Sequence, residues 1–112
     1  MAIPYNSNYD ETIPFSDVNA QFALAANANA TFTVPGPATS KYSARFSFIS
    51  TANIFVCINS AVVIPAPGTS TTQQYCEFRP ETQRYVQGGD VINVNTSDTT
   101  AYVGLSLRQL QG

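Results

Sequence analysis

Residues 22–34 read FALAANANATFTV, a run in which every even-numbered side chain is apolar and the odd-numbered ones are small or polar. Successive side chains of a β-strand point to opposite faces of the sheet, so a period of two predicts strand. A helix would spread the same apolar positions around its whole circumference and bury no common face. Asn27 and Asn29 break the run at its centre, and Asn tolerates the left-handed conformation of a turn. We therefore expect two short strands, or one bent strand, ending before Pro35.

Turn signals recur about every 8 to 12 residues along the rest of the chain, which is the spacing of antiparallel sandwiches and barrels. Residues 65–72 combine Pro, Gly, Ser and Thr and predict an exposed loop. No segment has a convincing helical period. Between the turns and this loop, strands are expected at residues 42–49, 54–58, 61–64, 73–79, 82–86, 91–95 and 101–110.

The pattern predicts an all-β fold class: a single-domain antiparallel β-sandwich, jelly-roll-like, with about eight strands. We assign residues 21–112 to this domain. Residues 1–20 are polar and lack a strand period, so we assign them to an extended N-terminal arm. One core between two sheets is expected to hold large apolar side chains of the alternating segments. They are Phe32, Val34, Phe46, Ile92, Val103, Leu105 and Leu107.

Charge is scarce in this chain of 112 residues, because only 11% of them are charged, against roughly a quarter in typical soluble domains. The net charge of −2 gives no electrostatic footprint for nucleic acid, and no apolar run approaches the roughly 20 residues of a membrane span. The N-terminal segment MAIPYNSNYDETIPF lacks the basic start and apolar stretch of a signal peptide. We therefore expect synthesis in a cytoplasm, no nucleic-acid or membrane partner, and two separate buried thiols at Cys57 and Cys76.

Candidates for catalytic chemistry are few, since the chain has no His, the commonest general base and metal ligand. Glu77 and Glu81 flank Arg79 and could face one cleft as glycosidase carboxylates do, but ion pairs with Arg79 or Arg84 are the favoured interpretation. Asp90 follows two glycines and is expected to form a turn rather than to bind calcium. We expect a protein that is not an enzyme, with no catalytic, cofactor-binding or metal site.

The N-terminal arm repeats an Ile-Pro-aromatic unit, at residues 3–5 and again at residues 13–15. Proline fixes φ and biases the preceding residue toward extended geometry, so apolar anchors are expected along a polar thread. Such anchors can dock in grooves of a partner, or they can cover the open end of the chain's own sandwich. With residues 65–72 as the next candidate, the expected partner-binding residues are Ile3, Tyr5, Tyr9, Ile13, Phe15, Pro65 and Pro67.

The surface is expected to be rich in Thr, Ser, Asn and Gln, a composition that suits both carbohydrate-binding modules and small proteins that assemble. Carbohydrate-binding modules usually offer exposed aromatic side chains, often Trp, and this chain has no Trp. Tyr42, Tyr75, Tyr85 and Tyr102 could serve instead. Half-buried positions in strands are the favoured expectation for these four tyrosines.

The arm, the Pro/Gly/Thr loop and the sequence QGGDVINVN followed by AYVGLSLRQL resemble the small capsid decoration proteins of tailed bacteriophages, also called cement or staple proteins. The most similar kind is the jelly-roll, epsilon15-like kind of short-tailed phages. The resemblance implies a non-enzymatic structural protein on the outer capsid surface of the virion. It also implies that the protein clamps subunits of the major capsid protein together and forms a homo-oligomer, a dimer in preference to a trimer. The alternative is a carbohydrate- or receptor-binding β-sandwich domain of a phage fibre or surface protein.

Overall fold

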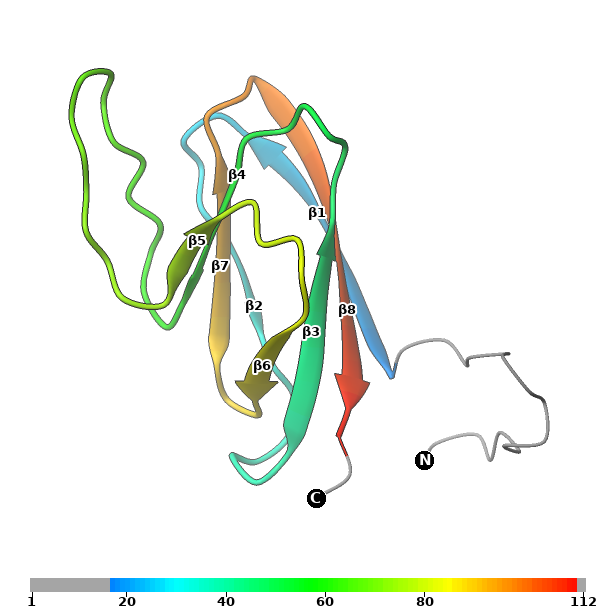
Figure 1. Cartoon of the computed structure of the whole chain (residues 1–112). Helices are drawn as coiled ribbons and strands as arrows, with labels where there is room; N and C mark the ends of the chain where they lie inside the picture. Colours follow the sequence, from blue (N-terminus) through cyan, green and yellow to red (C-terminus); the bar gives the residue numbers. More distant parts are fainter. Residues whose placement is uncertain (1–16, 111–112) are drawn as a thin grey trace.

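The structure is a computed structural model that describes residues 17–110, and in this part of the chain it contains eight strands and no helix (Figure 1). The strands are β1 (Val18–Ala25), β2 (Ala30–Thr33), β3 (Lys41–Ser47), β4 (Ile54–Ile58), β5 (Cys76–Phe78), β6 (Arg84–Gln87), β7 (Val91–Thr96) and β8 (Thr100–Gln109). The all-β prediction is confirmed.

The strands form two four-stranded antiparallel sheets, the first in the order β1-β8-β3-β6 and the second in the order β2-β7-β4-β5. The first strand pairs with the last, β2 with β7, β3 with β6, and β4 with β5. In the described residues, each of the first four strands thus pairs with one of the last four, as in a long hairpin. As a result, the two ends of the described chain meet: the Gln109 N–H donates to Asp17 Oδ2 at 2.7 Å.

The alternating run at 22–34 divides into β1 and β2, which belong to different sheets. Asn27 has a φ of 60°, in the left-handed region that Asn tolerates. Its N–H donates to Thr96 O at 2.9 Å, and the Ala28 N–H donates to Ala25 O at 3.2 Å. The prediction of two short strands with a break at Asn27–Asn29 is confirmed, and the even-numbered Ala26 and Ala28 at the break are exposed.

One hydrophobic cluster draws side chains from both sheets, and it contains all seven predicted core residues. Six of them are buried, and Phe32 is partly buried against the cluster. Strand β8 shows the alternation on which the core prediction rests. Its odd-numbered residues from Ala101 to Leu107 are buried, while the even-numbered residues between them are not. A strand with one covered face requires this alternation.

Two expectations for the secondary structure differ from what is found. The strand expected at residues 61–64 is absent, because the Gln73 side chain takes the backbone groups that a neighbouring strand would bind. Gln73 Oε1 accepts from the Val63 N–H at 3.1 Å, and Gln73 Nε2 donates to Ala61 O at 3.0 Å. In addition, β1 already begins at Val18, so residues 18–20 pair with β8.

The turn at residues 87–90 packs against the turn at residues 35–40. The Gly88 N–H donates to Ser40 O at 2.8 Å, and the Gly89 N–H donates to Val34 O at 2.9 Å. A Cβ atom at Gly88 would collide with the backbone carbonyl oxygens of Gly36 and Pro37. Glycine is therefore needed at residue 88 for the two turns to approach each other.

Candidate interaction surfaces

The long loop between β4 and β5, residues 59–75, projects beyond the sheets on the left of Figure 1. Its base is fixed by the Gln73 side chain, and its tip by a turn in which the Thr69 N–H donates to Ala66 O at 3.0 Å. Gly68, with a φ of 82°, lies in that turn. The loop prediction for residues 65–72 is confirmed, and Pro65 and Pro67 lie there, Pro65 partly buried and Pro67 exposed.

A disulfide joins Cys57 on β4 to Cys76 on β5, next to the base of this loop. The two residues are directly opposite each other in the antiparallel register of the two strands. The expectation of two separate thiols is therefore wrong. That expectation rests on the reducing compartment expected for the chain. The disulfide depends instead on the strand pairing, which brings the two sulfur atoms together.

A hollow of about 350 Å³ lies between the projecting loop and the β4–β5 edge of the second sheet. Its apolar lining includes Val63 and Pro65 from the loop, together with Phe55 and Phe78 from the strands. The two phenyl rings are 4.9 Å apart between centroids, and Phe78 remains half exposed. One of the two predicted loop residues, Pro65, thus contributes to a hollow with large apolar side chains.

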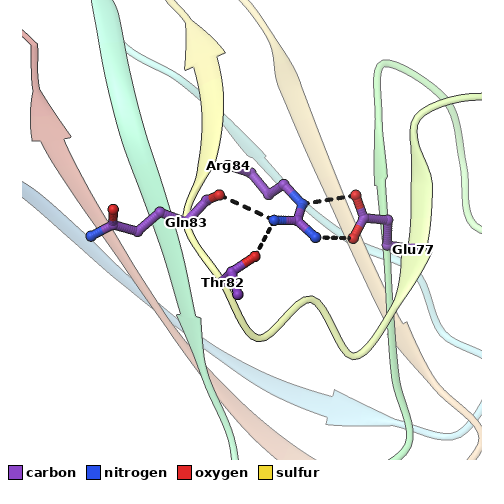
Figure 2. Close-up of polar contacts among 4 residues, drawn as sticks. All are labelled: Glu77, Thr82, Gln83 and Arg84. Carbon is purple, nitrogen blue, oxygen red and sulfur yellow. Dashed lines mark hydrogen bonds and ion pairs between the residues drawn. The ribbon is translucent and has the colours of Figure 1, made fainter.

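The edge strands β5 and β6, one from each sheet, are connected by an ion pair between Glu77 and Arg84 (Figure 2). Arg84 Nη2 donates to Glu77 Oε1 at 2.7 Å, and Arg84 Nε donates to Glu77 Oε2 at 2.8 Å. The same guanidinium group donates to Thr82 Oγ1 and to the Gln83 carbonyl oxygen. This segment is thereby ordered around one cation.

The register of these strands places Glu77 opposite Val56 and Arg84 opposite Ala44, two residues of the core. Both charged side chains therefore start on the core side of an edge strand, a position that discourages pairing with other chains. The hydrogen bonds from Arg84 lower the pKa of the Glu77 carboxyl, although partial burial opposes this. The same bonds raise the pKa of Arg84. Glu81 contacts Arg79 at 3.2 Å, so both expected ion pairs are confirmed.

Three of the four tyrosines are exposed rather than half-buried, which corrects the expectation for them. Tyr75, Tyr85 and Tyr102 are 76%, 59% and 74% exposed, and only Tyr42 is buried in the core. On their strands, Tyr85 is next to buried Val86 and Tyr102 is next to buried Val103, so both tyrosine side chains point away from the core. Tyr75 and Tyr85 line a hollow of about 140 Å³ beside the Glu77–Arg84 pair.

The outer face of the first sheet has an open hollow of about 670 Å³ around Gly104. Gly104 pairs with Gln21 on one side and Ser47 on the other and contributes no side chain of its own to the floor of this hollow. Tyr102 and Ile49, 74% and 70% exposed, are also in its lining. A large aromatic and a large aliphatic side chain are therefore held in water at the rim of a shallow depression.

The acidic and cysteine side chains of the described residues are the remaining candidates for binding a metal ion. No group of three or more Cys, Asp or Glu side chains there is placed to hold a metal ion. Asp90 forms the expected turn, since its carboxylate accepts from the Gln87 N–H at 3.0 Å and from Asn59 Nδ2 at 3.1 Å. No helix in residues 17–110 is long and apolar enough to cross a membrane.

Five predicted partner-binding residues, Ile3, Tyr5, Tyr9, Ile13 and Phe15, lie outside the described residues. Sequence reasoning did not single out the exposed Ile49 and Phe78, and it favoured a half-buried position for Tyr102. The alternation of residues 101–107 already indicates that Tyr102 lies on the face opposite the buried Val103. A comparison with protein-family models, with curated proteins and with solved structures found no match to the chain.

Proposed function

We propose that the protein is a non-enzymatic structural protein that binds the outer surface of a viral capsid and clamps neighbouring major capsid protein subunits together. The observation that carries the proposal is the group of large apolar side chains held exposed on ordered backbone. Ile49 and Tyr102 border one hollow, and Phe78 and Val63 border another on the other sheet. Exposed apolar patches of this kind mark protein–protein interaction sites.

The strand order supports a jelly-roll-like β-sandwich as the architecture of this clamp. The pairing of β1 with β8, β2 with β7, β3 with β6 and β4 with β5 is that of a long hairpin wrapped into two sheets. In such an arrangement the connections can vary without loss of the sheets, and the projecting loop at residues 59–75 is one of them. The proposed clamp combines this loop, the Ile49–Tyr102 hollow and the N-terminal arm.

Several weak contacts suit a protein that attaches to a preformed lattice. Each exposed apolar side chain buried at a partner contributes about 1.5 to 3 kcal/mol before ordering costs. Sites that engage together on one lattice act at high effective concentration, so no single contact has to be strong. A location on the virion and a homo-oligomer, with a dimer favoured, are parts of the same proposal.

The test is co-sedimentation with empty shells of the major capsid protein. Deletion of residues 1–16 and the substitution Tyr102→Ser should each lower binding by at least about tenfold, since each removes apolar contact area. Gly104→Leu is a sharper probe, because an added Cβ meets only Ser47 Cβ at 3.7 Å and the longer side chain would fill the hollow. Ser106→Ala, on the same strand, is the matched control. Binding equal to wild type in all three variants would refute the proposal.

One observation favours a second candidate, a carbohydrate-binding domain. Tyr75 and Tyr85 expose their rings beside a carboxylate and a guanidinium group, a combination of stacking and hydrogen-bonding groups that sugars use. A glycan array separates the two functions. Signals that disappear in Tyr85→Ala and persist in Tyr102→Ser would identify the sugar site and displace the capsid clamp as the main function.

A further inference from the structure

The four sheet edges differ in how they are protected from pairing with other chains. Exposed edges are normally kept short, charged or interrupted by proline. Strand β2 has four residues and is followed closely by Pro35, while β5 and β6 have three and four residues and carry Glu77 and Arg84. Strand β1 has eight residues, with sequence VNAQFALA, and none of these devices. Of the four edges, β1 is therefore the one best suited to pair with a strand of another chain.

One hydrogen bond at the end of β8 determines which residues of β1 point their backbone N–H and C=O groups outward. The Leu110 N–H donates to Lys41 O, so even-numbered residues of β8 bond to β3 and odd-numbered ones bond to β1. The β1–β8 register pairs odd-numbered β8 residues with even-numbered β1 residues. Gln21 and Ala23 therefore point their backbone N–H and C=O groups away from β8. Among residues 17–110, no strand is paired with that outer edge.

We infer that this edge binds β1 of a second copy, forming a two-fold symmetric dimer with a continuous eight-stranded sheet. A two-fold axis normal to the sheet makes equal strands antiparallel and keeps the outer faces of both sheets on one side. With Phe22 at the axis, Gln21 lies opposite Ala23 of the second copy, and Ala20 lies opposite Leu24. Phe22 faces its own copy at the axis, and at the flanking positions a longer side chain faces a short one, so the strand is complementary to itself.

Charge also favours a second copy as the occupant. Strand β1 has no charged residue, and the overlap from Ala20 to Leu24 brings no like charges together. In the described part of the chain the charged residues beside β1 are Asp17 and Arg108, which lie beyond this overlap. The dimer would also place the Tyr102–Ile49 hollows of both copies on one continuous face. Dimer formation itself does not depend on the proposed binding to a capsid.

The experiment is sedimentation equilibrium of the full chain over a range of concentrations, alone in buffer. The wild type should approach twice the 12.1 kDa of one chain and dissociate at roughly micromolar concentration, as expected for a narrow interface. Ala23→Pro removes an outward N–H that β8 does not use, so the monomer should fold. Symmetry removes that hydrogen bond twice, and the dissociation constant should rise at least about tenfold. Thr31→Pro, which removes an outward N–H on edge strand β2, is the matched control and should leave dimerisation unchanged.

A pair of charge variants tests the register without relying on proline. Gln21→Glu with Ala23→Glu puts like charges opposite each other in the dimer and should weaken it. Gln21→Lys with Ala23→Glu puts opposite charges there and should preserve it. The inference is overturned if the wild type is monomeric at every concentration, or if both double variants dimerise equally. It is also overturned if Ala23→Pro and Thr31→Pro have the same effect.

Discussion

Glu77 and Arg84 connect the two sheets through a bidentate ion pair, with Arg84 Nη2 2.7 Å and Nε 2.8 Å from the carboxylate oxygens. They come from edge strands that are not neighbours in either sheet. The pair therefore fixes β5 relative to β6, the two strands that residues 79–83 connect along the chain.

This ion pair makes stability depend on pH in the acid range. The pKa of Glu77 is lowered in the folded state, chiefly by the hydrogen bonds from Arg84. The stability that ionised Glu77 contributes is therefore fully present above the pKa of an unfolded Glu, about 4.3. This stability is lost as the pH falls through the lower pKa of the folded state. We expect the melting temperature of Glu77→Gln to lie below that of wild type at pH 7, and the difference to shrink below about pH 4. The effect is small, because both side chains are nearly half exposed.

Thermal melts of both proteins from pH 7 to pH 2 measure this difference. Asp98 also has a lowered pKa, mainly from the Asn53 backbone N–H, so the variant keeps part of the acid sensitivity. Glu81→Gln, on the same segment, is the control for a change of net charge. A difference between wild type and Glu77→Gln that stays constant down to pH 2 would contradict the assigned role of the ion pair.

The Cys57–Cys76 disulfide predicts that the unfolded, unreduced chain has no free thiol. Titration in guanidinium without reductant should count zero thiols, and two after reduction. The bridge spans 19 residues, so the double variant Cys57→Ser/Cys76→Ser should lose about 3 kcal/mol of unfolding free energy. Two free thiols in the protein as purified would show that the bridge does not form.

Leu105 tests the register of the central strand β8. It is 1% exposed and lies opposite Ala20 and Phe46. Leu105→Ala should cost about 2 to 5 kcal/mol in urea unfolding, because it leaves a cavity between the sheets. Leu110→Ala, at a 42% exposed position just after the same strand, should change the midpoint far less. Equal effects of the two substitutions would show that the register is wrong.

Gly88 tests the contact between the turns at 35–40 and 87–90. Gly88→Ala should destabilise the fold by about 1 to 3 kcal/mol, because the methyl group meets backbone carbonyl groups that cannot move aside. Gly104→Ala is the matched control, since the nearest atom to its Cβ would be Ser47 Cβ at an ordinary 3.7 Å. If both variants unfold at the same urea concentration, the close approach of the two turns is not required.

The sequence predicts the fold well because period-two alternation reports burial directly, as for Leu105 and for the break at Asn27. It fails where one long-range contact decides the structure. The absent strand at residues 61–64 depends on Gln73, and the disulfide depends on the register of β4 and β5. Surface hollows leave a weaker signal in the sequence, since the one at Gly104 arises from residues that are neighbours in space and not along the chain.

The hydrogen bond between Gln109 and Asp17 holds the two ends of the described chain next to each other, so a short linker could join them into a ring. A short Gly/Ser linker from Leu110 to Asp17 would complete that ring, and new ends could be opened at Gly68 in the exposed tip of the 59–75 loop. All eight strands would keep their partners in such a circular permutant, because the cut falls outside every strand. A passenger peptide fused at residue 68 would then leave the molecule from the projecting loop instead of from the end of the first sheet.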